Sequence, residues 1–156
     1  MSGGNVYDKT AAVSALLPGG EKHDQFRADL IRAKAAIEDA GGQAVTGYRA
    51  PSFSIDRRNL WAFPVLAEAG YAYSSSVAPV AHDHYGWRDA PRYAFRPLKD
   101  SPLVELPVTV ARVAGRHIAT GGGFFRMLPG ALTDFAVRQV NAEGHAGIFY
   151  FHPWEV

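Results

Sequence analysis

An alternation of helical and strand-like segments is the feature that most constrains how this chain folds. Residues 22–40 carry apolar side chains at steps of three and four residues, which indicates a helix with one apolar face. That face is expected to consist of Phe26, Leu30, Ala33, Ile37 and Ala40. Gly41 and Gly42 follow and predict the end of the helix, because glycine readily adopts the left-handed conformation of a helix C-cap.

Two further helices are expected, over residues 59–71 and 129–144. Pro64 lies inside the first of them, so this helix should start late or bend at the proline. Pro129 suits the first turn of the second helix, where a backbone N–H has no helical partner in any case. The inner face of the second helix is expected to carry Leu132, Phe135 and Val140.

Five short apolar stretches are predicted to form strands. They are residues 44–50, 71–77, 103–110, 116–120 and 147–153. The fourth is expected to pair with the third, and the last is apolar on both faces, as a buried parallel strand would be. Helices that alternate with strands predict an α/β fold with parallel strands. The irregular, aromatic stretch 78–101 is interpreted as a functional loop.

The composition fits one globular domain and argues against several functional classes. The 156 residues can bury a core, and a chain with 47% hydrophobic and 20% charged residues is typical of folded proteins. A net charge of +1 without a basic stripe argues against nucleic acid as a partner, and the absence of cysteine excludes disulfides and thiolate metal sites. No apolar run reaches the roughly 18 residues of a membrane span. Because residues 1–10 lack the features of a signal peptide, we expect a cytoplasmic protein.

Polar residues gather at the expected carboxyl ends of the strands, where the active residues of α/β proteins are found. Arg49, Ser74–Ser76 and His152 all have this position. An imidazole suits proton transfer near neutral pH, so His152 is a candidate catalytic residue. The alternative is a strand-end histidine that bonds to a backbone group.

Two charged residues at strand ends allow different interpretations. Arg49 enters a loop made rigid by Pro51, where a guanidinium can hold a carboxylate through two parallel hydrogen bonds. The alternative for Arg49 is an ordinary surface arginine. Glu105 is expected to be buried, and to cap backbone groups or pair with an arginine rather than act as an acid or base.

Two loop motifs give weaker chemical signals. His82, Asp83 and His84 could bind a metal, but one nearby carboxylate leaves the ligand set thin, and a solvated or substrate-facing loop is the alternative. Gly121–Gly123 lacks the spacing of a nucleotide-binding loop, and no G-x-S-x-G motif accompanies it. We interpret this stretch as a tight loop that lets the backbone approach another group.

Taken together, several stretches resemble one known family. Polysaccharide deacetylases, the carbohydrate esterase family 4-like group with NodB homology, contain in the same order the stretches GYRAPSFSI, WAFPVLAEAGYAYSSSV, HDHYGWRDAPRY, LVELPVTV, GGGFFRMLPG and IFYFHPWEV. The chain is most similar to the subgroup linked to bacterial exopolysaccharide and exosortase loci. The similarity covers residues 22–156, the C-terminal portion of the family's domain, and leaves 1–21 as a loosely ordered N-terminal segment.

The resemblance implies an α/β fold that is a partial, deformed (β/α) barrel without its first strands. In the family, one aspartate and two histidines hold a divalent metal, commonly zinc. The metal and an aspartate base activate water against the N-acetyl group of an amino sugar. Arg49 and Pro51 match the arginine–proline motif whose arginine orients the base, and His152 matches the histidine that protonates the leaving amine. The implied substrate-binding residues are Pro51, His82, Asp83, Tyr85, Gly122, Gly123, Phe125 and Trp154.

The sequence also departs from the family pattern. The aspartate pair and the His-x-x-x-His motif of the metal site are missing, and Ser74 stands where an aspartate is common. We therefore expect the C-terminal part of a metal-dependent deacetylase that is incomplete or inactive alone and binds no metal by itself. The expected ligand is an amino-sugar polysaccharide or oligosaccharide, and the chain is expected to form a homo-oligomer or to need a missing N-terminal half. A non-catalytic carbohydrate-binding module and a self-associating module are the alternatives.

Overall fold

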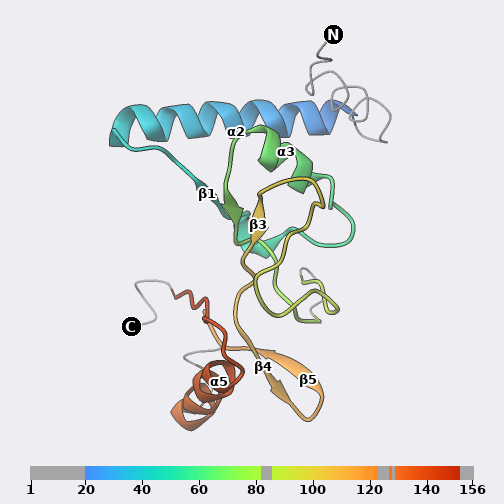
Figure 1. Ribbon diagram of the computed structural model, residues 1–156, viewed down its shortest axis with the longest axis vertical. Coiled ribbons are helices and arrows are strands. Elements are labelled where there is room, and N and C mark those ends of the chain that lie inside the picture. Colours follow the sequence, from blue (N-terminus) through green and yellow to red (C-terminus); the bar gives the residue numbers. More distant parts are fainter. Residues whose placement is uncertain (1–19, 82–85, 123–126, 128, 152–156) are drawn as a thin grey trace.

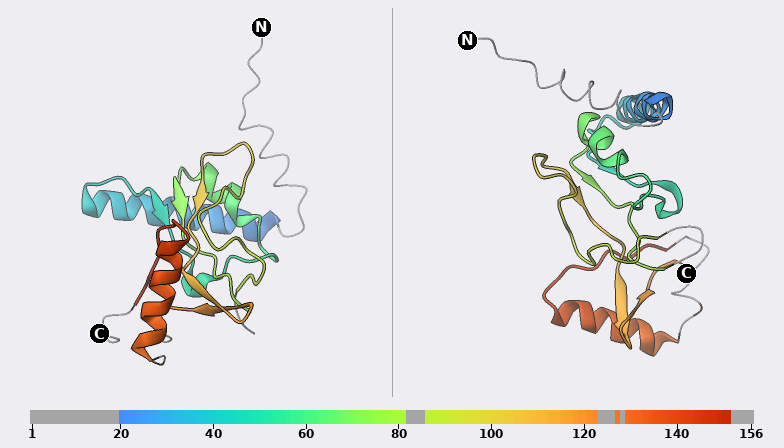
Figure 2. Two further views of the ribbon diagram at one scale, coloured as in Figure 1. Left: turned by 60° about the horizontal axis from the view of Figure 1, so that its bottom comes forward. Right: turned by 90° about the vertical axis from the view of Figure 1, so that its right-hand side faces the viewer.

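The computed structural model describes residues 20–81, 86–122, 127 and 129–151. Figure 1 shows helix α2 (Gly20–Gly41) at one end, with helix α3 (Ala62–Glu68) next to it. A small parallel sheet follows, and a hairpin with helix α5 (Gly130–Ala142) lies at the opposite end. The right-hand view of Figure 2 shows the sheet and its loops between α2 and α5. No helix among the described residues is long and apolar enough to cross a membrane.

Three parallel strands form the sheet that positions the polar residues described below. They are β1 (Gly47–Tyr48), β2 (Tyr73–Ser74) and β3 (Val104–Glu105), in the order β1-β2-β3. Gly47 pairs with Tyr73, and Tyr73 pairs with Val104, so all three strands end at the same edge. The prediction of an α/β fold with parallel strands is confirmed. The described residues form no closed barrel, and the implied partial barrel is not confirmed.

Helix α2 forms where the apolar periodicity predicts it, but part of the buried face differs from the prediction. The helix ends as expected, because Gly42 adopts a φ of 63° and its N–H donates to the Glu38 carbonyl at 2.9 Å. Leu30 is buried, whereas Ile37 is 58% exposed. Ala33 and Ala40, also expected on the inner face, are exposed as well.

Polar side chains of α2 face α3 in place of these apolar residues. Lys34 Nζ donates to the carbonyl oxygens of Ala69 and Gly70, at 3.2 and 3.1 Å, where the last carbonyls of a helix lack partners within it. Arg27 forms an ion pair with Glu68. The inner face of α2 is therefore partly polar, which is why apolar periodicity alone predicts it incompletely.

Two hydrophobic clusters hold the elements together. The first lies between α2, α3 and the sheet, and its most deeply buried members include Phe63, Leu66, Val77 and Leu103. The second joins the loops that follow the sheet to the hairpin, and consists of Phe53, Ala78, Val80, Val108 and Val110, with Ala119 and Tyr150 packed against it. Helix α3 begins two residues before Pro64, so the proline occupies its first turn and the expected late start is confirmed.

The apolar stretch 103–110 does not form one continuous strand. Strand β3 ends at Glu105, and strand β4 (Val110–Val113) starts beyond Pro107, which has no N–H to contribute to a sheet. Strand β4 pairs antiparallel with β5 (Arg116–Ala119). The pairing predicted for the fourth apolar stretch is therefore confirmed, but its partner is the segment after the proline.

Helix α5 packs against β4 through a mixed face. Ala136 and Val140 are buried, whereas Phe135 is 46% exposed, so its predicted place on the inner face is wrong. Gln139 lies on that inner face instead. Its Oε1 accepts the Arg112 N–H at 2.7 Å and its Nε2 donates to the Arg112 carbonyl at 3.0 Å. The buried face of α5 is thus centred on Ala136 and Val140 and leaves Phe135 at its side, because the Gln139 amide fixes the helix on the backbone of β4.

The last apolar stretch does not form the buried strand predicted for it over its described residues, 147–151. Single hydrogen bonds hold it instead. The carbonyls of Ile148 and Tyr150 accept the N–H groups of Thr109 and Gly122, at 3.0 and 2.8 Å. The two phenylalanines that alternate with them are exposed, one of them by 59%. This stretch is therefore covered on one side only, although its sequence is apolar throughout.

Candidate functional site

The carboxyl edge of the parallel sheet brings together charged and hydroxyl side chains. Arg49 follows β1 by one residue, Ser75 and Ser76 follow β2, and Glu105 is the last residue of β3. Because the strands are parallel and in register, these residues meet at one edge of the sheet. We call the group formed by Arg49, Ser74–Ser76 and Glu105 the edge cluster.

The Arg49 guanidinium is fixed by two hydrogen bonds to a single residue. Its Nε donates to the Ser75 carbonyl at 3.0 Å, and its Nη2 donates to Ser75 Oγ at 2.8 Å. The guanidinium carbon lies 5.4 Å from the centre of the Phe53 ring, a cation–π distance. Arg49 is exposed, and Nη1 bonds to no described residue. A guanidinium held in this way can offer its remaining N–H groups to an acidic group.

The turn after Arg49 has unusual backbone geometry. The exposed Pro51 begins a one-turn 3₁₀ helix in which Ser52 and Phe53 have φ angles of 56° and 49°. Such angles are strained for residues other than glycine, and they are concentrated at functional sites. The Phe53 ring packs on Tyr150, with ring centroids 4.7 Å apart. The strained turn is therefore anchored on the C-terminal segment of the chain.

Glu105 is fully buried and braces the loop that holds Arg49. Its Oε1 accepts the N–H groups of Ser76 and Val77, at 2.7 and 2.8 Å, so the expected capping of backbone groups is confirmed. Its Oε2 forms no hydrogen bond of normal geometry with a described residue. Burial raises the pKa of the Glu105 carboxyl, although the Ser74 hydroxyl, the two N–H groups and the charge of Arg49 oppose the rise.

Hydroxyl groups join the strand ends to one another. Ser74 Oγ donates to Ser76 Oγ at 2.8 Å, and Ser76 Oγ accepts the Ala50 N–H at 2.9 Å. Both serines are fully buried. An aspartate at position 74, which is common in the family that the sequence resembles, would place a second buried carboxylate near Glu105. Since buried like charges repel, the neutral hydroxyl of Ser74 suits this cluster.

Most of the predicted catalytic and substrate-binding residues lie outside the described residues. They are His152, His82, Asp83, Tyr85, Gly123, Phe125 and Trp154. Gly122 is described, and it has a φ of 60° and is buried against the C-terminal segment. A Cβ on Gly122 would lie 2.2 Å from Tyr150 Oη. The interpretation of the glycine-rich stretch as a tight loop whose backbone approaches another group is confirmed at this residue, whose N–H also donates to the Tyr150 carbonyl at 2.8 Å.

The described residues do not fit the metal site that the resemblance implies. No group of three or more histidine, aspartate or glutamate side chains in the described part of the chain could hold a metal ion. Two of the described histidines stack on aromatic rings, His23 on Trp61 at 4.0 Å and His145 on Tyr93 at 3.7 Å. The carboxylate of the edge cluster, Glu105, is occupied by backbone N–H groups.

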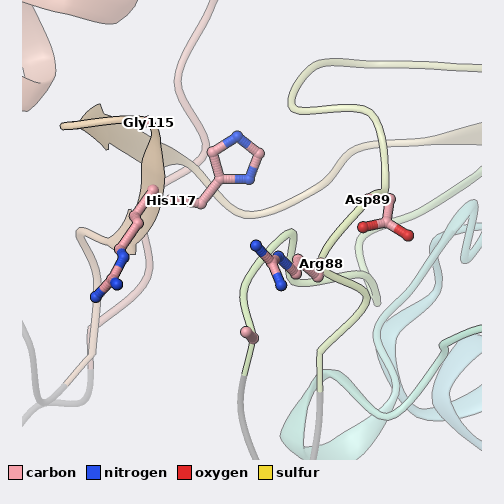
Figure 3. Close-up of a pocket in the computed structure, with 6 residues that line it drawn as sticks. Arg88, Asp89, Gly115 and His117 are labelled. Carbon is pink, nitrogen blue, oxygen red and sulfur yellow. The ribbon is translucent and has the colours of Figure 1, made fainter.

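A separate cavity of about 430 Å³ lies between the loop after residue 86 and the β4–β5 hairpin (Figure 3). Its lining consists of Ala81, Arg88, Asp89, Gly115, Arg116 and His117. Figure 3 shows the Arg88 guanidinium and the His117 ring on different sides of the cavity. The local sequence gives only a weak signal for this cavity, which is the pair of arginines around Asp89 in WRDAPR. A stronger signal is not expected, because only the fold brings the loop to the hairpin.

The fold and the edge cluster define an α/β protein whose parallel strands end in a shared polar site. Residues 75–156 match the family described as a domain of unknown function, DUF3473. The match covers more than half of the chain, and the chain therefore belongs to this family. The matched residues include Glu105 and the lining of the cavity, whereas Arg49 precedes them. No curated protein and no solved structure matches the chain.

Proposed function

We propose that this chain forms the C-terminal part of a metal-dependent polysaccharide deacetylase, which hydrolyses the N-acetyl groups of amino sugars. The observation that carries the proposal is the position of Arg49. It follows a strand at the carboxyl edge of the sheet, is fixed on Ser75, and lies beside Phe53, which packs on Tyr150. The arginine of the arginine–proline motif is thus linked, through the Phe53 ring, to the segment that leads to His152. This link supports the shared site that the resemblance to polysaccharide deacetylases implies.

The proposal gives the two residues separate roles in amide hydrolysis. Arg49 offers N–H groups to the aspartate base and holds that carboxylate in the orientation that accepts a proton from water. His152 donates a proton to the nitrogen of the leaving amine. The strained turn at Ser52 and Phe53 keeps the guanidinium in place between the sheet edge and the C-terminal segment.

The metal and the base are assigned to other sequence. A metal ion of this kind supplies a nucleophilic water near neutral pH when it is bound. The described residues do not fit such an ion, and the sequence lacks the family's aspartate pair and His-x-x-x-His motif. The proposal therefore places the metal ligands and the aspartate base on a missing N-terminal half or another polypeptide. The chain alone is therefore proposed to be incomplete or inactive.

A comparison of the chain alone with a longer polypeptide tests this proposal. We expect the DNA upstream of Met1 to contain an in-frame segment that encodes an aspartate pair and a His-x-x-x-His motif. The longer polypeptide with Zn²⁺ should release acetate from chitin-type oligosaccharides, whereas the chain alone should release none and bind zinc weakly. In the longer form, Arg49→Ala should lower kcat about a hundredfold, because misplacing a reacting group by about 1 Å has an effect of that size.

The control for this experiment is Arg138→Ala, which removes an exposed arginine of α5. It should leave kcat unchanged. The site would be complete in this chain if the chain alone bound stoichiometric zinc through its own residues and released acetate. That activity should then be lost in His152→Ala. A longer polypeptide that carries both motifs, binds zinc and releases no acetate would overturn the deacetylase assignment.

A second candidate function is a carbohydrate-binding or self-associating module without catalysis. It is favoured by Phe149 and Phe151, which are exposed at alternate positions of the C-terminal segment. Exposed aromatic rings can stack on sugar rings or pack on another copy of the chain. This candidate requires no metal and no base.

Binding experiments separate the two candidates. Binding of amino-sugar oligosaccharides that survives His152→Ala but is lost in Trp154→Ala and Phe151→Ala would favour the carbohydrate-binding module. An oligomer at micromolar concentration in light scattering, dissociated by Phe151→Ala, would favour self-association. A monomer that binds no oligosaccharide would exclude both forms of the second candidate.

A further inference from the structure

The described lining of the cavity between the loop after residue 86 and the hairpin has a surplus of positive charge. Arg88 and Arg116 belong to its lining, and neither forms an ion pair with a described residue. Asp89, the carboxylate of the lining, is already paired with Arg57 at 2.8 Å. An anionic ligand would therefore meet uncompensated cations in this cavity.

His117 contributes a ring whose orientation is fixed. Its Nδ1 lies 2.8 Å from the Pro79 carbonyl, and a carbonyl can only accept, so Nδ1 carries the proton and donates. This bond holds the ring at the cavity, opposite the Arg88 guanidinium (Figure 3). The two side chains come from different elements, β5 and the loop after residue 86, so a ligand between them would contact both.

We propose that this cavity binds the carboxylate of an acidic sugar, a uronic acid residue of a polysaccharide. The carboxylate binds Arg88, because the fork of an arginine matches the two oxygens of a carboxylate. Since Nδ1 of His117 donates to the Pro79 carbonyl, Nε2 of the neutral ring is an acceptor, and it accepts a hydrogen bond from a sugar hydroxyl. A volume of about 430 Å³ is within the range of small-ligand sites. The identity of the ligand as a polysaccharide rests on the proposed function, whereas the binding of an anion rests on the cavity alone.

Asp89 favours a sugar carboxylate over a free inorganic anion. Its oxygens can accept hydrogen bonds from the several hydroxyl groups of a sugar ring, whereas a sulfate ion has no O–H group and a phosphate ion has few. The combination of two cations, a fixed imidazole and one carboxylate is thus best matched by a ligand with one negative charge and several hydroxyls.

The test is calorimetric titration of the whole chain with glucuronate and galacturonate trisaccharides. The same trisaccharides with methyl-esterified carboxylates are the neutral controls, and inorganic phosphate is the competing anion. Arg88→Gln should weaken uronate binding about tenfold or more, because it removes charge-assisted hydrogen bonds. His117→Asn should weaken it as well, since asparagine can keep a donor near the Pro79 carbonyl but lacks the second ring nitrogen. The matched control, Arg138→Gln on α5, should leave binding unchanged.

Circular dichroism shows whether each variant is folded. Because Arg88 is exposed, its replacement should not disturb the core. The proposal is overturned if no uronate binds, if the methyl esters bind equally well, or if Arg88→Gln and Arg138→Gln have equal effects. It is also overturned if phosphate binds as tightly as uronate with the same dependence on Arg88. Failure here combined with acetate release by the longer polypeptide would leave the proposed function standing. Uronate binding without any acetate release by the longer polypeptide would leave the uronate site standing and overturn the proposed function.

Discussion

The Glu105 carboxylate and the Ser76 N–H are joined across the end of the parallel sheet by a hydrogen bond of 2.7 Å. Glu105 ends β3, and Ser76 lies two residues beyond the end of β2. Ser75, whose carbonyl and hydroxyl hold Arg49, is the residue directly before this contact. The strands of this sheet have two residues each, so a buried side chain, rather than a long backbone ladder, fixes the position of Arg49.

The pH dependence of stability should report on Glu105. Burial raises the pKa of this carboxyl in the folded state above 4.5, its ordinary value in an unfolded chain. Between pH 4.5 and the folded-state pKa, the folded protein therefore binds more protons than the unfolded chain. The contribution of Glu105 to the free energy of unfolding is therefore fully present below pH 4.5 and is lost as the pH rises through the folded pKa. Glu105→Gln should remove this fall, which urea unfolding between pH 4.5 and neutral pH measures. Parallel pH profiles of the two proteins would contradict the prediction.

Asp56 should show the opposite pH dependence. A hydrogen bond from the Arg58 side chain lowers the pKa of this carboxyl in the folded state below 3.8. Its contribution to stability is therefore present above pH 3.8 and is lost as the pH falls through the folded pKa. Asp56→Asn should flatten the acid side of the stability profile. It should leave the change in the free energy of unfolding between pH 4.5 and neutral pH unaffected. If both substitutions altered the same side of the profile, the assigned directions would be wrong.

Gly122 should not tolerate a side chain. Its φ of 60° is left-handed, and a Cβ there would lie 2.2 Å from Tyr150 Oη. Gly122→Ala should lower the free energy of unfolding by about 1–2 kcal/mol, the usual cost of this conformation for other residues. Gly130→Ala is the matched control, because a Cβ at Gly130 meets nothing within 4 Å and the residue begins α5. Thermal unfolding of both variants measures the difference, and equal losses would contradict the close contact with Tyr150.

Gln139 should stabilise the attachment of α5 to β4. Its amide both accepts from and donates to the backbone of Arg112, at 2.7 and 3.0 Å. Gln139→Leu should lower the free energy of unfolding by roughly 1 kcal/mol, since these bonds are exposed and water can replace them in part. Arg138→Leu changes the neighbouring residue of the same helix and should have a smaller effect. A stabilised Gln139→Leu variant in urea unfolding would show that apolar contact outweighs the two bonds.

Ser75 should act on catalysis through Arg49, if the proposed function holds. Ser75→Ala removes the hydroxyl acceptor of Nη2 and leaves the carbonyl acceptor of Nε. In the longer polypeptide with Zn²⁺, this change should lower kcat roughly tenfold with little change in KM, because the guanidinium loses its orientation. Ser75→Thr keeps a hydroxyl and should restore kcat. A full kcat in Ser75→Ala, at an unchanged melting temperature, would show that the hydroxyl does not position Arg49.

The sequence predicted those features that depend on local pattern. Helix α2 follows from apolar residues at steps of three and four with glycines after them. The contact between Arg49 and Ser75 follows from two parallel strands that end at Tyr48 and Ser74. The capping role of Glu105 also followed from its place at a strand end. In each case, one element and its nearest neighbour determine the outcome.

Features that depend on distant contacts were not predictable in this way. Lys34 turns toward the end of α3 because unpaired carbonyls lie there, and this contact decides which face of α2 is buried. The apolar run at the C-terminal end lacks a neighbouring strand on the described part of the chain, so its composition did not predict its conformation. The cavity between Arg88 and His117 depends on a loop and a hairpin that are far apart in the sequence.

The point at which the family match begins has a consequence for truncation. Ser75 lies one residue beyond β2, so a polypeptide cut there would lose two of the three parallel strands and both helices that cover Leu103. Its newly bared apolar surface would favour aggregation over autonomous folding. Expression boundaries for this protein should accordingly include α2 and start no later than Gly20, well before the first residue that sequence comparison recognises.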